Sequence, residues 1–140
     1  MDMKLYKIDF ETSRAVYEEC KDYIEMKMCY NNVASCMGRS FLLMREDVRV
    51  VYGAIKFDED MYIKHCFMMI DDRVIDATLF THLREGDENT EYIVCKSFTR
   101  EEYIKALEDC DLDCNLNKYT REPYMETYKK LWAENKVLVG

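Results

Sequence analysis

The sequence is poor in the residues that form nucleotide-binding loops and flexible linkers. It has four glycines, one proline and no glutamine in 140 residues. Four glycines without a Gly-rich loop exclude the backbone cradles that bind phosphate groups. No apolar run approaches the length of a membrane-spanning helix, and the first residues lack the pattern of a signal peptide. We therefore expect a cytoplasmic protein that does not bind membranes.

Basic residues are outnumbered. Twenty Lys and Arg against 28 Asp and Glu give a net charge of −8 at pH 7. A field of this sign repels phosphate backbones, and no run of Lys or Arg offers a local exception. The charge argues against nucleic acid and is compatible with a protein, peptide or small-molecule partner.

Seven cysteines are many for this length, but their odd number and irregular spacing do not suggest a disulfide scaffold. In a reducing compartment most of them are expected to be small buried apolar residues. Cys95, Cys110 and Cys114 outline a metal site only loosely, and no histidine accompanies them. We expect neither a metal nor a cofactor.

An apolar fraction of 49% and this length predict one folded domain spanning residues 1–140. Residues 4–10 alternate as a strand does, and Thr12 or Ser13 can cap a helix that fades near Lys27. A second helix begins at Cys29, with an apolar stripe that continues to Met44. Four further strands are predicted at 48–57, 61–70, 73–79 and 91–98.

The C-terminal part is predicted to be helical. Thr99 and Glu102 have the spacing of a capping box, which predicts a helix to about Cys110. Pro123 suits the first turn of a final helix, whose aromatic residues form core packing or, alternatively, a homodimer face: Tyr124, Tyr128 and Trp132. Helices, then consecutive strands, then helices predict an α+β domain in which the N-terminal helices pack on an antiparallel sheet.

The hairpin at 61–79 brings two polar side chains together. If Asp71 and Asp72 form a two-residue turn, Ile70 pairs with Arg73, and His65 and Asp76 become diagonal neighbours on one face. A three-residue turn would place Asp76 on the opposite face. A carboxylate beside an imidazole fixes its tautomer and its direction.

Cys29 supplies a nucleophile for the same site. The N-terminus of a helix favours a thiolate, an imidazole can take the thiol proton, and the backbone N–H of Cys29 can donate to an oxyanion. The alternative is structural: His65 lies among Ile63, Phe67 and Met69, and a cysteine before an apolar helix is unremarkable in a chain with seven.

Four short segments carry a resemblance to a known family. They are Cys-Tyr-Asn-Asn at 29–32, Val-Tyr-Gly-Ala at 51–54, His-Cys-Phe at 65–67 and Val-Ile-Asp-Ala-Thr at 74–78. Together they resemble a group of small bacterial and phage proteins that is similar to a minimal branch of the papain-like and transglutaminase-like cysteine enzymes. Those enzymes share the order of a helix-borne Cys, a strand-borne His, and an Asp or Asn on the next strand.

The resemblance implies a papain-like fold and a role for each matched residue. Cys29 matches the nucleophile, His65 the general base and acid, and Asp76 the carboxylate that orients His65. The residues implied in binding are Tyr30, Asn31, Asn32 and Phe67, although for Asn32 we prefer a structural role as a hydrogen-bond anchor for the following strand. Gly53 and Thr78 read as structural. The implied activity is that of a cysteine hydrolase or acyl-transferase acting on an amide or thioester.

The sequence also departs from that pattern. Ala77 replaces the usual Pro, Phe67 stands where Trp is common, and without glutamine the second oxyanion donor must be Tyr23, Tyr30, Asn31 or a backbone N–H. These departures support an alternative, in which a papain-like fold serves a non-enzymatic phage or bacterial protein that sequesters a ligand or inhibits a host factor.

Overall fold

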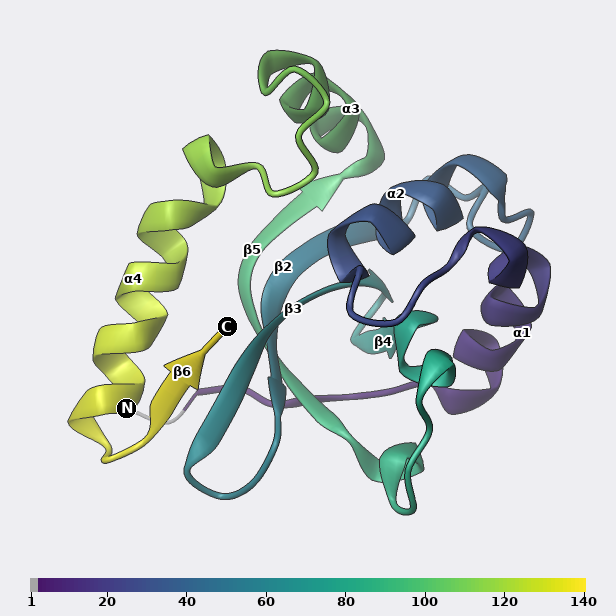
Figure 1. Cartoon of the computed structure of the whole chain (residues 1–140). Helices are drawn as coiled ribbons and strands as arrows, with labels where there is room; N and C mark the ends of the chain where they lie inside the picture. Colours follow the sequence, from purple (N-terminus) through teal and green to yellow (C-terminus); the bar gives the residue numbers. More distant parts are fainter. Residues whose placement is uncertain (1–2) are drawn as a thin grey trace.

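The computed structural model describes residues 3–140, which fold around a curved mixed sheet (Figure 1). The helices are α1 (Phe10–Cys20), α2 (Cys29–Arg39), α3 (Arg100–Asp109) and α4 (Asn117–Ala133). The strands are β1 (Tyr6–Lys7), β2 (Val48–Lys56), β3 (Met61–Ile70), β4 (Arg73–Ile75), β5 (Glu91–Thr99) and β6 (Val137–Val139). The predicted α+β class is confirmed.

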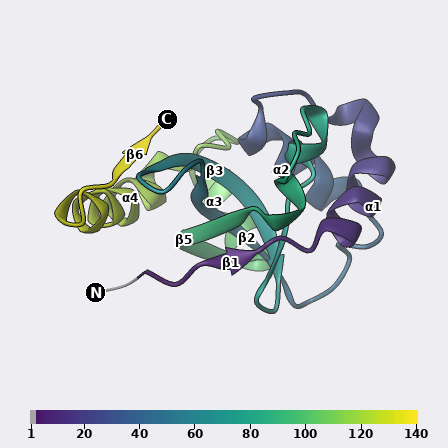
Figure 2. The same cartoon turned by 90° about the horizontal axis from the view of Figure 1, so that it is seen from below.

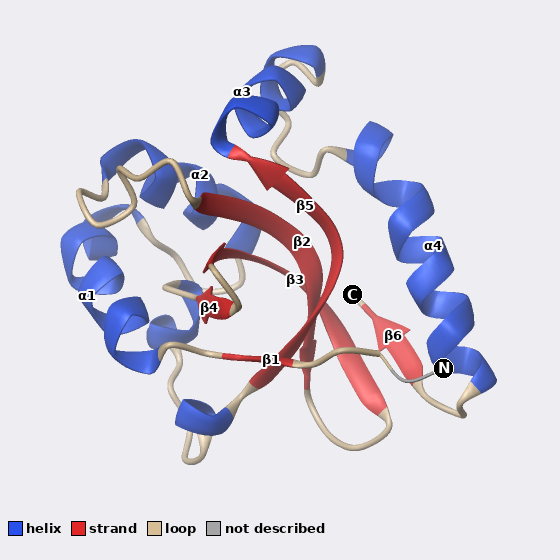
Figure 3. Cartoon of the chain, turned by 180° about the vertical axis from the view of Figure 1, so that it is seen from behind, coloured by secondary structure: helices blue, strands red, loops and turns tan. Residues whose placement is uncertain are grey.

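The strands lie in the order β1-β5-β2-β3-β4, and each neighbouring pair is antiparallel. Seen from below, β1 runs along β5 at the edge of the sheet (Figure 2). The short strand β6, which the sequence did not predict, pairs with the start of β3 in parallel and makes the sheet mixed. In Figure 3, α1 and α2 lie on one flank of the sheet and α4 on the other.

The hairpin between β3 and β4 has the predicted two-residue turn, and Ile70 pairs with Arg73. The predicted strand at 73–79 is too long, because β4 ends at Ile75 and a 3-10 helix follows at Thr78–Thr81. The backbone N–H of Asp76 donates to the Ser13 hydroxyl at 2.9 Å instead of continuing the ladder. Asp76 therefore sits just beyond the paired strand.

The sheet has two buried faces that alternate along β3. Tyr52, Cys66 and Met68 belong to the larger core cluster, together with residues of α1, α2, α3 and α4. Phe67 and Met69 belong to a smaller cluster on the opposite face, with Tyr92 of β5. Because side chains alternate along a strand, His65 shares the face of Phe67.

The first two helices differ from their predicted bounds. Helix α1 starts at Phe10 instead of after residues 12–13, because the Asp9 side chain accepts from the Thr12 N–H at 3.1 Å and caps it. It ends at Cys20, and Lys21–Tyr23 form a 3-10 turn. Helix α2 starts at Cys29 as predicted but ends at Arg39, because the Ser40 hydroxyl bonds Glu19 and the backbone turns extended.

The predicted apolar stripe is therefore wrong beyond α2, since Phe41 and Met44 are exposed. In the C-terminal part, the Thr99 capping box is confirmed. Helix α4 begins at Asn117, so that Pro123 lies inside it and not in its first turn. The predicted core role holds for Tyr124 but not for two exposed aromatic residues that stack on each other at 6.2 Å between centroids: Tyr128 and Trp132.

None of the helices within residues 3–140 combines the length and the apolar character that a membrane crossing requires.

Gly53 allows the close strand approach that the sequence predicted. It pairs with His65 across β2 and β3, and a register shift lies between Tyr52 and Gly53 where β2 meets β5. A Cβ at this position would overlap the Ile93 carbonyl oxygen and lie 3.2 Å from Phe67 Cε1. The bulge places bare backbone beside the strand that carries His65.

Replacing Gly53 by Ala should lower the free energy of unfolding by about 1–3 kcal/mol, because a backbone carbonyl cannot move aside cheaply. Gly38→Ala is the matched control, since a Cβ on this exposed helical glycine meets nothing within 4 Å. That control should stabilise the protein by about 0.5–1 kcal/mol through helix propensity. Urea unfolding of both variants measures the difference, and equal effects would contradict the assigned crowding.

Candidate active site

A buried carboxylate holds the imidazole. Asp76 is 1% exposed, and its Oδ2 lies 2.8 Å from His65 Nε2. A carboxylate only accepts hydrogen bonds, so His65 Nε2 must carry a proton and donate. The contact predicted from the hairpin is thus present, although the two residues are not joined by strand pairing. Nδ1 remains as the ring nitrogen available for other chemistry.

Two residues that the sequence did not point to complete the surroundings of Asp76. The Tyr92 hydroxyl donates to the same Oδ2 at 2.7 Å, and Ser13 accepts from the Asp76 backbone N–H. Burial, followed by the charge and hydrogen bond of Asp76, raises the pKa of Tyr92, so its hydroxyl keeps its proton and stays a donor. Asp76 is therefore fixed from both its side chain and its backbone.

The environment of His65 shifts its pKa in two opposite directions. Burial lowers its pKa, while the charge of Asp76, their hydrogen bond and the proximity of Cys29 raise it, with a net pKa of about 10. Phe67 and Tyr92 rings lie beside the imidazole, each with centroids 6.2 Å away. The charge and the hydrogen bond of Asp76 are the largest of the contributions that raise the pKa of His65, because the carboxylate is buried and bonded directly to the ring.

Cys29 is the first residue of α2 and partly exposed. Met28, which precedes it, provides no side-chain cap, so the first backbone N–H groups of α2 are not bound by a capping side chain. Cys29 lies beside the ring of His65 and raises its pKa through a hydrogen-bonding contact and its charge. The thiol and the imidazole are therefore neighbours in the site.

Asn32 ties the start of α2 to the segment that follows Asp76. Its amide binds the backbone of Glu25 twice, at 3.0 and 2.7 Å, and donates to the Thr78 hydroxyl at 3.0 Å. Asn32 and Thr78 are both buried. This is a structural anchor, placed differently from the one that the sequence suggested, because it holds the chain before α2 and not the strand after it.

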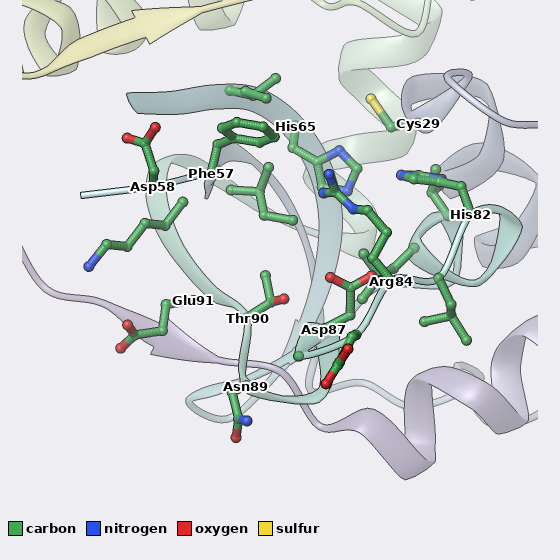
Figure 4. Close-up of a pocket in the computed structure, with 18 of the residues that line it drawn as sticks. Cys29, Phe57, Asp58, His65, His82, Arg84, Asp87, Asn89, Thr90 and Glu91 are labelled. Atoms are coloured by element: carbon green, nitrogen blue, oxygen red, sulfur yellow. Dashed lines mark hydrogen bonds between the residues drawn. The ribbon is translucent and has the colours of Figure 1, made fainter. Parts of the chain in front are cut away.

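Cys29 and His65 line a common pocket of about 1050 Å³. One wall is the end of the β2–β3 hairpin, with Ile55, Phe57 and Ile63, and the other is the segment 78–91 (Figure 4). The apolar patches in these walls are interrupted by charged side chains of both signs. The pocket is therefore suited to an extended substrate with polar groups.

The predicted binding residues do not line this pocket. Phe67 and Asn32 are buried, and Tyr30 stacks on Tyr52 with centroids 5.6 Å apart. Asn31 is exposed on the first turn of α2. Sequence adjacency to Cys29 and His65 does not specify which face of an element a side chain occupies, so the binding role of these four residues stays a prediction.

The positions of Tyr23 and Tyr30 reduce the number of groups that could donate to an oxyanion. Tyr23 is exposed and covered by the Arg39 guanidinium at 3.6 Å from its ring centroid, and Tyr30 is packed against the core. The backbone N–H groups at the start of α2 lie on the element that carries the thiol itself. They are the donors best placed to face a carbonyl oxygen bound at Cys29.

Asp76→Asn should lower the pKa of His65 from about 10 to 6.5 or below, because the largest contribution that raises it disappears while burial remains. NMR titration of the imidazole protons measures this directly, with His82→Asn removing the other histidine signal. Tyr92→Phe is the control, since it keeps the carboxylate and should leave the pKa of His65 above 6.5. A wild-type value near 6.5 would contradict the assigned ion pair.

The same pair should make stability depend on pH. In the unfolded chain His65 loses its proton near pH 6.5, whereas in the folded protein it keeps it to about 10. The stabilisation is therefore complete below pH 6.5 and is lost as pH rises toward 10, by up to roughly 1.4 kcal/mol per pH unit. Urea unfolding of wild type and His65→Gln between pH 6 and 10 should show this slope only in the wild type.

Within residues 3–140, no group of three or more His, Cys, Asp or Glu side chains is arranged to hold a metal ion. Comparisons of the chain with protein-family models, with curated proteins and with solved structures found no match. What the site does must therefore be argued from its own geometry.

Proposed function

We propose that the protein is a cysteine hydrolase or acyl-transferase that acts on an amide or thioester through Cys29, His65 and Asp76. The observation that carries this proposal is the 2.8 Å hydrogen bond from His65 to the buried Asp76 carboxylate, in the wall of a pocket that also exposes Cys29. A histidine that is only a core residue has no need of a buried charged partner, because burying a carboxylate is costly unless a function or a network requires it.

In the first step, Cys29 Sγ attacks the substrate carbonyl carbon. The thiol proton resides on His65, so that the attacking group is a thiolate and the ring an imidazolium held by Asp76. A C–S bond forms, and the carbonyl electrons move onto oxygen, where backbone N–H groups at the start of α2 stabilise them. The oxyanion then collapses, the bond to the leaving group breaks, and His65 gives its proton to the departing amine or thiolate.

In the second step, the acyl group leaves Cys29. Water or an acceptor amine enters the pocket and loses a proton to His65 as it attacks the thioester carbon. The C–S bond breaks, the thiolate is restored, and the imidazolium is formed again. Water gives hydrolysis and an amine gives transfer, so the same residues support both reactions.

The arrangement of elements supports a papain-like interpretation of the fold. The thiol is on a helix, the imidazole on β3 and the carboxylate directly after β4, which is the next strand of the chain. The papain-like order predicted from the sequence is therefore compatible with the observed α+β topology. Tyr92 extends the site by donating to the carboxylate, and Ser13 by accepting from the Asp76 backbone N–H.

Alkylation tests the nucleophile. At pH 6, iodoacetamide should label Cys29 at least about tenfold faster than Cys95 or Cys114, which are also partly exposed, because only Cys29 has an imidazole partner. His65→Ala should remove this advantage. Peptide mass spectrometry of timed samples gives the rate at each cysteine.

His82→Ala is the matched control, since His82 lines the same pocket but its ring nitrogen Nδ1 bonds the neighbouring Thr81 hydroxyl at 2.9 Å and not Asp76. It should leave the labelling of Cys29 unchanged. Equal rates at all three cysteines, together with no effect of His65→Ala, would contradict the role of Cys29 as nucleophile. The non-enzymatic binding protein would then be the remaining hypothesis.

A further inference from the structure

The pocket wall that faces the hairpin carries a cation without a carboxylate partner. Arg84 follows the 3-10 helix Thr78–Thr81 and points into the pocket (Figure 4). Its Cζ lies 5.5 Å from the centroid of the Phe57 ring, so the side chain reaches from one wall to the other. Among the ion pairs of residues 3–140, none involves Arg84.

The backbone around Arg84 is fixed even though its side chain is exposed. The Arg84 N–H donates to Asp87 Oδ2 at 2.8 Å, and the Asp87 N–H donates back to the Arg84 carbonyl at 3.2 Å. Asp87 is buried beneath this turn. The guanidinium is thus presented from an anchored position, because only the side chain itself is free to move.

We propose that Arg84, resting on Phe57, binds a carboxylate of the substrate, so that the preferred substrates carry one negative charge close to the scissile carbonyl. This inference rests on the proposed function, since it names the substrate class of the same site. An arginine offers N–H donors in a planar fork that matches a carboxylate bidentately. Contact with the face of an aromatic ring orients the guanidinium while its N–H edges stay free.

The remaining charges of the pocket favour a single carboxylate over a polyanion. Lys56 is paired with Glu59 at 3.5 Å, so it is not a free cation at the tip of the hairpin. Asp58, at the same tip, accepts from the Asp60 N–H. Glu85 and Glu91 line the same pocket. Among the ion pairs of residues 3–140, none involves its two remaining cations, Lys27 and Lys64, and the Lys64 ammonium lies over the Tyr124 ring. An extended acidic chain would meet these carboxylates and the net charge of −8.

A pair of alkylating probes of similar size tests the inference at Cys29. Iodoacetate carries a carboxylate and iodoacetamide a neutral amide, and in both the thiolate forms a bond to the methylene carbon as iodide leaves. The ratio of their rates at Cys29 reports the local preference for a negative charge. In Arg84→Met, which keeps the apolar stem, this ratio should fall about five- to tenfold at low salt.

Two variants control for other causes. Arg39→Met removes an arginine that covers a tyrosine ring in the same way but does not line the pocket, and it should leave the ratio unchanged. Arg84→Lys should retain part of the preference. His65 is intact in all these variants, so its own attraction for iodoacetate cancels in the comparison.

The outcomes separate the inference from the proposed function. An unchanged ratio in Arg84→Met, or an equal fall in Arg39→Met, overturns the assignment of Arg84, whatever the absolute rate at Cys29. Slow labelling of Cys29 by both probes contradicts instead its proposed role as nucleophile. If the ratio of the two rates still depends on Arg84 in that case, the anion site is supported. The iodoacetamide rate alone also reveals whether a variant has disturbed the thiol.

Discussion

The buried carboxylate of Asp76 is the constraint around which this end of the molecule is arranged. An isolated carboxylate in the core would cost several kcal/mol, so it must be bound by groups that do not move away. His65 of β3 and Tyr92 of β5 bind the carboxylate, and Ser13 of α1 holds the residue by accepting from its backbone N–H. β4 therefore ends where it does because the backbone at Asp76 is needed for a bond to α1 and not for the sheet.

The parts of the fold that depend on local chemistry could be predicted from the sequence. The turn at Asp71 and Asp72, the capping box of Thr99 and the start of α2 are set by residues within one or two turns of the chain. The contact of His65 with Asp76 followed from the turn length. The contact forms even though β4 ends before Asp76, because two diagonal neighbours need only lie on the same face of the hairpin.

The parts that depend on distant segments could not be predicted. The end of α2 is decided by a bond between Ser40 and Glu19, which overrides an apolar stripe that continues past it. Tyr92 reaches Asp76 because β5 lies on the far side of β2, a strand order that one sequence does not specify. Arg84 belongs to the pocket because its loop folds back toward the hairpin, and β6 is too short to carry an alternation pattern.

The bonds that assemble the site also span long stretches of chain. Ser13 and Asp76 are 63 residues apart, Asn32 and Thr78 are 46 apart, and Tyr92 lies 16 residues beyond Asp76. Closing such loops lowers the entropy of the chain before the contacts form, so we expect these bonds to form in the slow, late part of folding. A chain still emerging from the ribosome lacks the bond between Tyr92 and Asp76 until residue 92 has been synthesised. The reactivity that we propose for Cys29 is then a property that the protein acquires only on completing its fold.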